Sequence, residues 1–276
     1  MQSIKFWKLA VMLFVAASCN NPAEKEKDEL ETPFVKAMSE RTIEYKAGDV
    51  TMVGFVAYDS ASNATRPAIL VVPEWWGLNE YAKGRARQLA ALGYVAMAVD
   101  MYGNGLQADN PEMAGKLATP FYENPAMAQE RFTAALQALK TIAVTDSNKI
   151  AAIGYCFGGA QVLNMARLGV PLKGVVSFHG NLIGVPLQKD MLKAAVLVCH
   201  GADDQFVPQT EVATFKKQMD SLAIPYNFRE YAGATHAFTN PGATEMGKKF
   251  NLPIAYHAAA DTASWNEMTQ FLRDIF

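Results

Sequence analysis

The sequence predicts an α/β protein with a mostly parallel sheet that is covered by helices on both faces. Short, near-continuous apolar runs recur between residues 51 and 231, and such runs are typical of strands that are buried on both faces. Longer stretches with a helical pattern separate most of these runs, so consecutive strands can be joined by helical crossovers and lie parallel. These two observations define the fold class.

The expected strands are recognised by their β-branched and other apolar residues. In chain order they are TMVGFVA (51–57), AILVV (68–72), YVAMAV (94–99), KIAAIG (149–154), GVVSFH (174–179), AVLVCH (195–200) and YNFREY (226–231). The expected helices lie around residues 80–92, 124–143, 158–168, 208–222 and 254–274. No internal repeat and no linker interrupts this region, so we predict one domain over residues 34–276, a usual size for a single α/β domain.

The composition narrows the classes of function. The chain has 276 residues and a formal net charge of -2, which gives no broad basic field for binding a nucleic acid. Its 3 cysteines, at positions 19, 156 and 199, exclude a disulfide framework, and no CxxC pair is present for redox chemistry or zinc binding. No two histidines have the spacing of metal ligands, so we expect no metal and no other cofactor.

The N-terminus has the order of a secretory signal. Lys5 and Lys8 precede an apolar run over residues 9–17, and small residues lead up to Cys19. The run is too short to span a bilayer. A cysteine directly after the small residues resembles the lipobox of bacterial lipoproteins, in which it takes a lipid and becomes the mature N-terminus. We therefore expect a signal peptide over residues 1–18 and lipidation of Cys19.

The flanking residues complete the expectation for this segment. Ala16 stands where a lipobox usually has Leu or another large aliphatic residue, so ordinary cleavage after Ala17 stays open. Residues 19–33 are polar and charged, and we expect them to form a solvated tether. The protein is expected to be exported and anchored through lipid on the periplasmic or cell-surface side of a membrane, or otherwise to be secreted or periplasmic.

A motif for a nucleophile follows the strand expected at 149–154. Gly154, Cys156 and Gly158 have the spacing G-x-C-x-G, which is the G-x-S-x-G nucleophile elbow with sulfur in place of the serine oxygen. The glycines leave room for the strand and the following helix to approach each other. The thiol would lie at a helix N-terminus, where the helix dipole favours a thiolate. Taken alone, the motif also fits a buried structural cysteine.

An acid and a base follow in the chain order that this kind of site requires. Asp204 comes after the strand expected at 195–200, and His236 comes after the strand expected at 226–231. His236 would take a proton from Cys156, and Asp204 would hold the imidazole and stabilise its charged form. Asp204 by itself could be a turn residue or a helix cap. Three such residues in order at three strand ends favour a catalytic triad.

Four segments resemble the signatures of the dienelactone hydrolase family within the α/β-hydrolase fold. They are VVPEWWGLN, GYCFGG, GADDQFVP and GATHAF, and the resemblance covers most of residues 50–275. It implies Cys156 as the nucleophile and His236 as the base. It also implies Asp204, rather than Asp203, as the acid, because Asp204 stands directly before QFVP.

The same resemblance implies roles for the segment PEWWG. Glu74 is expected to contact the resting thiol and to swing away when substrate binds. The backbone N–H groups of Phe157 and Trp75 are expected to form the oxyanion hole, where removing one donor typically costs about 3 to 4 kcal/mol of transition-state stabilisation. Because the two tryptophans adjoin this hole, we expect Trp76 with Trp75 to form an apolar pocket wall, together with Tyr102.

Two positions depart from the pattern of the family. Dienelactone hydrolases hold their substrate's carboxylate with two arginines, one just after a strand and one four residues past the catalytic histidine. Here the matching places are the segment Met101-Tyr102-Gly103 and Asn240, and neither is basic. We therefore expect the acyl chemistry to transfer to this chain but not the anionic substrate.

The remaining cysteine and histidines have simpler interpretations. Cys199 lies inside a strand pattern and is expected to be a small buried hydrophobe. His179 and His200 end strands at the functional edge, where a hydrogen-bonded structural role is expected. His257 lies in the C-terminal helix pattern, at the surface or in the core.

The expected function is hydrolysis of carboxylic esters or lactones through a thioester acyl-enzyme on Cys156. Two alternatives remain open at this point. The same triad could serve an acyltransferase or a thioesterase, which product analysis would separate. The chain could also be a non-catalytic surface binding protein on a hydrolase fold, although the intact Cys, Asp and His disfavour it. We expect a monomer that takes a small-molecule ester or lactone and meets a membrane only through its N-terminal lipid.

Overall fold

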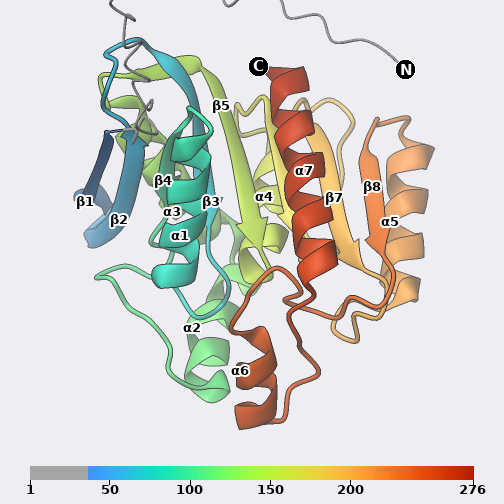
Figure 1. Ribbon diagram of the computed structural model, residues 1–276. Coiled ribbons are helices and arrows are strands. Elements are labelled where there is room, and N and C mark those ends of the chain that lie inside the picture. Colours follow the sequence, from blue (N-terminus) through green and yellow to red (C-terminus); the bar gives the residue numbers. More distant parts are fainter. Residues whose placement is uncertain (1–36) are drawn as a thin grey trace, which may run out of the picture. The chain divides into compact units, whose positions relative to one another are not determined.

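The computed structural model describes residues 37–276. The expected signal peptide (1–18), Cys19 and the tether (19–33) lie outside the described residues. One sheet of eight strands runs through the domain in the order β1-β2-β4-β3-β5-β6-β7-β8 (Figure 1). The strands are Met38–Ala47 (β1), Val50–Asp59 (β2), Arg66–Val72 (β3), Val95–Ala98 (β4), Thr145–Tyr155 (β5), Gly174–Phe178 (β6), Ala195–Gly201 (β7) and Asn227–Tyr231 (β8).

The sheet is parallel over most of its width, as the sequence predicts. β4, β3, β5, β6, β7 and β8 pair in parallel, whereas β1 pairs antiparallel with β2 and β2 pairs antiparallel with β4. The carboxyl ends of the parallel strands therefore lie at one edge, where ligands bind in open α/β sheets. Cys156, Asp204 and His236 all follow strands that end at this edge.

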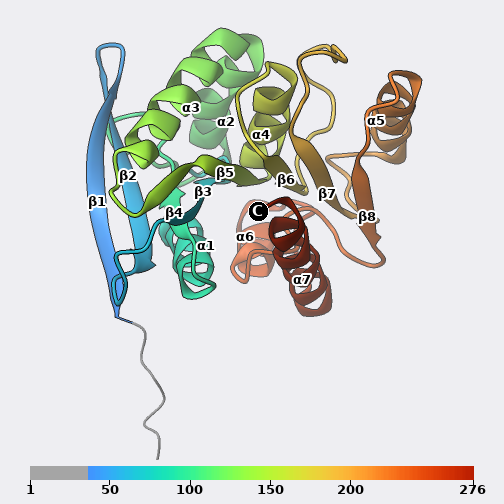
Figure 2. The ribbon, with the colours of Figure 1, turned by 90° about the horizontal axis from the view of Figure 1, so that it is seen from above.

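Helices cover both faces of the sheet. They are Glu80–Ala91 (α1), Pro111–Glu123 (α2), Pro125–Lys140 (α3), Phe157–Arg167 (α4), Gln209–Ser221 (α5), Ala243–Phe250 (α6) and Ala258–Ile275 (α7). In Figure 2, α2, α3, α4 and α5 lie on one side of the sheet and α1, α6 and α7 on the other. No helix of residues 37–276 is both long enough and apolar enough to cross a membrane.

Each face of the sheet has its own apolar core. Phe132 and Leu136 of α3, Leu163 of α4 and Phe215 of α5 pack against Leu70 and the other side chains on one face. On the opposite face a second cluster joins the sheet to α1 and α7. The strands read as nearly continuous apolar runs because alternate residues enter these two cores, and both cores exclude water.

Three elements were not expected from the sequence, and one expected helix was wrong at its start. β1 is an edge strand whose residues are largely polar and exposed, so it lacks the apolar run by which the inner strands are recognised. α2 and α6 are short helices beside the site. Residues 254–257 are not helical: Ile254 forms an isolated bridge with His236, and α7 begins only at Ala258, after His257.

Candidate active site

Cys156 lies in a strained turn between β5 and α4. Its φ is +53° and its ψ is -116°, a conformation that costs free energy for a residue with a side chain and that clusters at functional sites. The turn depends on its flanking glycines, since a Cβ on Gly154 would lie 2.0 Å from the Gly158 carbonyl oxygen and a Cβ on Gly158 would lie 2.2 Å from the Val72 carbonyl oxygen. The motif thus has the close backbone approach that its spacing predicts.

Two backbone N–H groups beside the thiol are placed to bind an oxyanion. Phe157 is the first residue of α4, so its N–H has no partner within the helix. Trp75 lies in a tight turn in which the Gly77 N–H donates to the Glu74 carbonyl oxygen at 3.1 Å. This bond holds the Glu74–Trp75 peptide and with it the direction of the Trp75 N–H.

Tyr102 supports that turn from behind instead of lining the cavity as expected. Its hydroxyl donates to the Trp75 carbonyl oxygen at 2.9 Å, and its ring packs against Phe121 and Phe157. The side chain is buried, and it is not among the residues that line the cavity. Asp100 anchors the loop that carries Tyr102 by accepting from its backbone N–H at 3.1 Å. The hydroxyl is thus used up in holding the oxyanion turn.

Asp204 and His236 form a buried hydrogen-bonded pair. His236 Nδ1 lies 2.8 Å from Asp204 Oδ2, while Oδ1 accepts from the backbone N–H groups of Phe206 at 2.8 Å and Val207 at 3.2 Å. The loops that carry the pair are joined by a bond from the Asp203 N–H to the Ala234 carbonyl oxygen at 3.0 Å. Asp204 therefore presents one fixed oxygen to the imidazole.

The second nitrogen of His236 is available to the thiol. Burial by itself would lower the pKa of His236, but the charged Cys156 sulfur and the hydrogen-bonded Asp204 carboxylate raise that pKa to about 10. The imidazole therefore keeps its proton at neutral pH while the sulfur is charged. Phe206 and His179 pack edge-on against the ring, with centroid distances of 5.0 and 5.2 Å. The structure brings the predicted Cys, His and Asp together in one cluster.

His179 supports the nucleophile turn from inside the protein. Its Nδ1 accepts from the Cys156 backbone N–H at 3.1 Å, so its proton lies on Nε2 and points to Thr239 Oγ1 at 2.7 Å. Burial, together with the nearby His236, lowers the pKa of His179 well below its usual value. His179 is thus a neutral, hydrogen-bonded structural histidine, as the sequence suggested.

Glu74 lies in the wall of the site, where its carboxylate is hydrogen-bonded to Asn240. Asn240 Nδ2 donates to Glu74 Oε2 at 2.7 Å, and both side chains are buried. Among the hydrogen bonds of the described residues, this is the one that the Glu74 side chain makes; the bond to the resting thiol implied by the resemblance is not formed in this structure. Asn240, at the place of one missing arginine, therefore holds the glutamate away from the sulfur.

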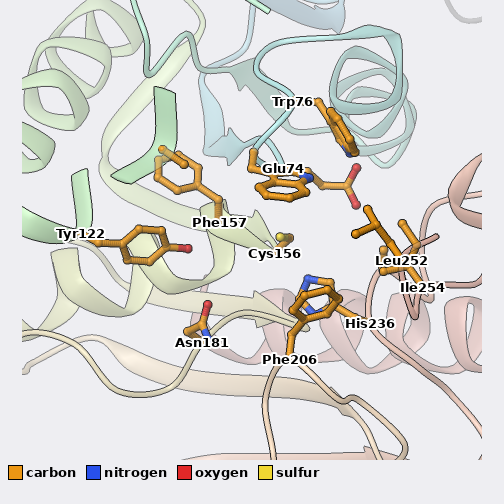
Figure 3. Close-up of a pocket in the computed structure, with 13 residues that line it drawn as sticks. Glu74, Trp76, Tyr122, Cys156, Phe157, Asn181, Phe206, His236, Leu252 and Ile254 are labelled. Atoms are coloured by element: carbon orange, nitrogen blue, oxygen red, sulfur yellow. The ribbon is translucent and has the colours of Figure 1, made fainter. Parts of the chain in front are cut away.

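A cavity of about 180 Å³ opens above the Cys156 thiol (Figure 3). Its walls are mainly apolar. The lining residues are Glu74, Trp75, Trp76, Ala118, Tyr122, Cys156, Phe157, Asn181, Phe206, His236, Ala237, Leu252 and Ile254. Figure 3 shows Tyr122 entering from one side and Leu252 and Ile254 from the opposite side. Trp75 and Trp76 form a wall, as the sequence predicts.

Several of these lining residues escaped the sequence analysis. Tyr122 belongs to α2, Asn181 follows β6, and Leu252 and Ile254 belong to the segment between α6 and α7. None carries a local motif, because each is brought to the thiol by the packing of a separate segment. Phe206 was within reach, since it lies in the QFVP segment directly after Asp204.

The other singled-out residues lie away from the cavity. Cys199 is fully buried, and burial raises the pKa of its thiol to about 12, which makes it unreactive. His200 is buried beside Phe228, and His257 accepts from the Ala260 N–H as the N-cap of α7. Within residues 37–276, no group of three or more His, Cys, Asp or Glu side chains is arranged to hold a metal ion.

A thiol on a strand–turn–helix elbow, a His–Asp pair on the next loops and two aligned N–H donors define an enzyme of the α/β-hydrolase class. The model of the dienelactone hydrolase family matches residues 52–276. The chain belongs to the dienelactone hydrolase family, and it is a carboxylic ester hydrolase.

Comparisons with individual proteins agree with this assignment. A curated relative from Aquifex aeolicus with the provisional name carboxymethylenebutenolidase is 29% identical over 203 residues, which cover 72% of this chain and 86% of the relative. A solved dienelactone hydrolase-like promiscuous phosphotriesterase from metagenomic libraries is 35% identical, with a TM-score of 0.81, and the match covers 87% of this chain and 99% of that one. A dienelactone hydrolase structure from Klebsiella pneumoniae, at 22% identity and a TM-score of 0.73 over 86% of this chain and 99% of that one, shares the fold.

Proposed function

We propose that the enzyme hydrolyses small, neutral carboxylic esters or lactones through a thioester on Cys156. The observation that carries this proposal is the thiol in its strained elbow, next to an imidazole whose other nitrogen is held by Asp204 at 2.8 Å. A buried structural cysteine, such as Cys199, needs neither a strained backbone nor a histidine beside it. The arrangement therefore favours a nucleophile.

In the acylation step the sulfur attacks the carbonyl carbon of the ester. His236 takes the thiol proton, and the carbonyl oxygen becomes an oxyanion that accepts from the N–H groups of Phe157 and Trp75. The tetrahedral intermediate collapses with loss of the alcohol oxygen, to which His236 returns the proton. The product is an alcohol and a thioester between the acyl group and Cys156.

In the deacylation step water takes the place of the thiol. His236 removes a proton from the water as its oxygen attacks the thioester carbonyl, and the same two N–H groups hold the second oxyanion. When the C–S bond breaks, the sulfur leaves with the electron pair and the imidazolium balances its charge or returns the proton. An alcohol or amine in place of water would give acyl transfer, so product analysis distinguishes the two outcomes.

The charges around the cavity favour neutral acyl groups over anionic ones. A substrate carboxylate would lie near the Glu74 carboxylate, and Asn240 offers it no positive charge. Arg229 does not supply that charge, since it is paired at the surface with Glu267 at 3.3 Å. A carboxylate buried without a cation is heavily penalised, whereas an arginine in a bidentate contact would have recovered much of that cost.

We therefore expect a neutral short-chain ester to exceed a carboxylate-bearing dienelactone in kcat/KM by at least about tenfold, or about 1.4 kcal/mol. The measurement compares the two substrates at low and moderate salt, with product analysis for each. A preference for the carboxylate that weakens with added salt would contradict the charge argument. Failure to turn over any ester or lactone of the panel would contradict the proposed function itself.

We also propose that the protein is exported and anchored through lipid on Cys19. The support is the order of the N-terminal sequence: basic residues, a short apolar run, small residues and then the cysteine. Expressed in a bacterium with its full N-terminus, the protein should partition with membranes, and Cys19→Ala should release it or stall its processing. A mature N-terminus at Ser18 without modification, found by mass spectrometry, would indicate ordinary secretion instead.

A further inference from the structure

Glu74 places a carboxylate in the cavity wall with only a neutral partner. The side chain is 2% exposed, and its hydrogen bond is with the Asn240 amide at 2.7 Å. An ionised carboxylate in such a place is costly unless a positive charge lies nearby. The enzyme therefore has an unbalanced acidic group at the site where its substrate is bound.

The charged and titratable groups that face Glu74 leave it without a dedicated cation. Arg85 of α1 is bound to Asp261 at 2.5 Å and to the Thr239 carbonyl oxygen at 2.6 Å. His236 is paired with Asp204 and Cys156, and Tyr81 and Tyr155 bring hydroxyl groups without charge. Among the residues that the structure describes, no lysine or arginine lines the cavity.

These surroundings make Glu74 responsive to pH and to a bound charge. Burial raises the pKa of Glu74 to about 7, against smaller lowering effects of Asn240, His236 and Arg85. The group is therefore mostly protonated near pH 6 and mostly ionised near pH 8. A cation in the cavity would favour the ionised form and offset its desolvation.

Aromatic rings provide the rest of a cation site. Trp75, Trp76, Tyr122, Phe157 and Phe206 all line the cavity, and Figure 3 shows Tyr122, Phe157 and Phe206 around the sulfur, with the Glu74 carboxylate on the side of Leu252 and Ile254. The face of an aromatic ring attracts a cation, and rings of this kind recognise quaternary ammonium groups. The volume of about 180 Å³ slightly exceeds an apolar cavity of about 150 Å³ that binds benzene, so it suits a group of that size.

We infer that this cavity selects small esters that carry an ammonium or quaternary ammonium group, and that Glu74 is the residue that determines the selectivity. The inference rests on the proposed ester hydrolysis for its chemistry, and it adds the charge of the substrate. The carboxylate supplies the opposite charge, and the aromatic walls replace the water that an alkylammonium group loses on binding.

A pair of isosteric esters tests the inference. Acetylcholine and 3,3-dimethylbutyl acetate have nearly the same shape and differ in one positive charge, so their kcat/KM ratio reports the charge preference alone. We expect acetylcholine to be favoured by at least about tenfold at pH 8 and by clearly less at pH 6. In Glu74→Gln the ratio should fall towards one at pH 8, whatever happens to the absolute rates. A matched variant on α7, Glu267→Gln, should keep the wild-type ratio.

A binding measurement separates this inference from the proposed function. Choline and its neutral isostere 3,3-dimethylbutan-1-ol are titrated against the wild-type protein by calorimetry, and we expect choline to bind more tightly, with the difference lost in Glu74→Gln. Turnover of both esters at equal kcat/KM, or a preference that Glu74→Gln leaves intact, overturns the inference and leaves the hydrolase intact. If neither ester is hydrolysed, tighter binding of choline supports the inference while the proposed function fails, and equal binding overturns it.

Discussion

Cys156→Ala should reduce ester hydrolysis by at least about 10³-fold while the fold stays intact. Removing the nucleophile of a catalytic triad leaves only the binding and oxyanion contributions to the rate. The substitution removes a single sulfur at the cavity, where Cys156 is only partly buried, so the packing of the domain changes little. The measurement is kcat/KM for a neutral short-chain ester, with circular dichroism to check the fold.

The thioester gives this prediction a second readout. Intact-protein mass spectrometry of wild-type enzyme quenched during turnover should show an acyl adduct that is absent from Cys156→Ala. Cys199→Ala is the matched control, because that cysteine is buried away from the cavity, and it should retain most of the activity. A correctly folded Cys156→Ala variant that kept a tenth of the wild-type rate would show that the thiol is not the nucleophile.

Asp204→Asn should lower kcat by about 10³- to 10⁴-fold, as the equivalent change does in serine proteases. Asp204 Oδ1 accepts from the backbone N–H groups of Phe206 and Val207. An asparagine keeps those two bonds only by turning its oxygen to the backbone and its NH₂ to His236. Nδ1 of the imidazole must then accept, its proton moves to Nε2, and the nitrogen that faces Cys156 can no longer take the thiol proton.

Asp203→Asn is the matched control for this variant. Asp203 is exposed, and its contribution to the loop is the bond from its backbone N–H to the Ala234 carbonyl oxygen, which the substitution preserves. We expect nearly wild-type kinetics from it. If Asp203→Asn lost the activity and Asp204→Asn kept it, the acid of the triad would have to be reassigned.

The fold class and the reacting groups could be predicted because each depends on a short stretch of chain. A strand that is buried on both faces must be apolar along its whole length, so inner strands such as Ala195–Gly201 are visible in the sequence. The elbow around Cys156 needs Gly154 and Gly158, since any side chain there would meet backbone atoms. The order of nucleophile, acid and base along the chain then follows from the order of the parallel strands.

The edge strand and the wall elements could not be predicted in the same way. β1 is stabilised by its ladder with β2, while its exposed side chains carry no apolar pattern. The start of the last helix was misplaced because residues 254–257 have helical spacing in the sequence, although Ile254 is instead held in a bridge to His236. In both cases long-range backbone pairing outweighs the local pattern.

What the sequence determined by itself is the chemistry of this enzyme: an α/β domain, a thiol nucleophile candidate and its His–Asp partner, each required by rules that act within a few residues. What only the tertiary structure decided is the environment of that chemistry. Tyr102 faces the oxyanion turn instead of the cavity, and the Glu74 carboxylate is bonded to Asn240 instead of to the thiol. Both outcomes depend on side-chain directions and on contacts between segments far apart in the chain, because burial and hydrogen bonding select one rotamer from several that the local sequence allows.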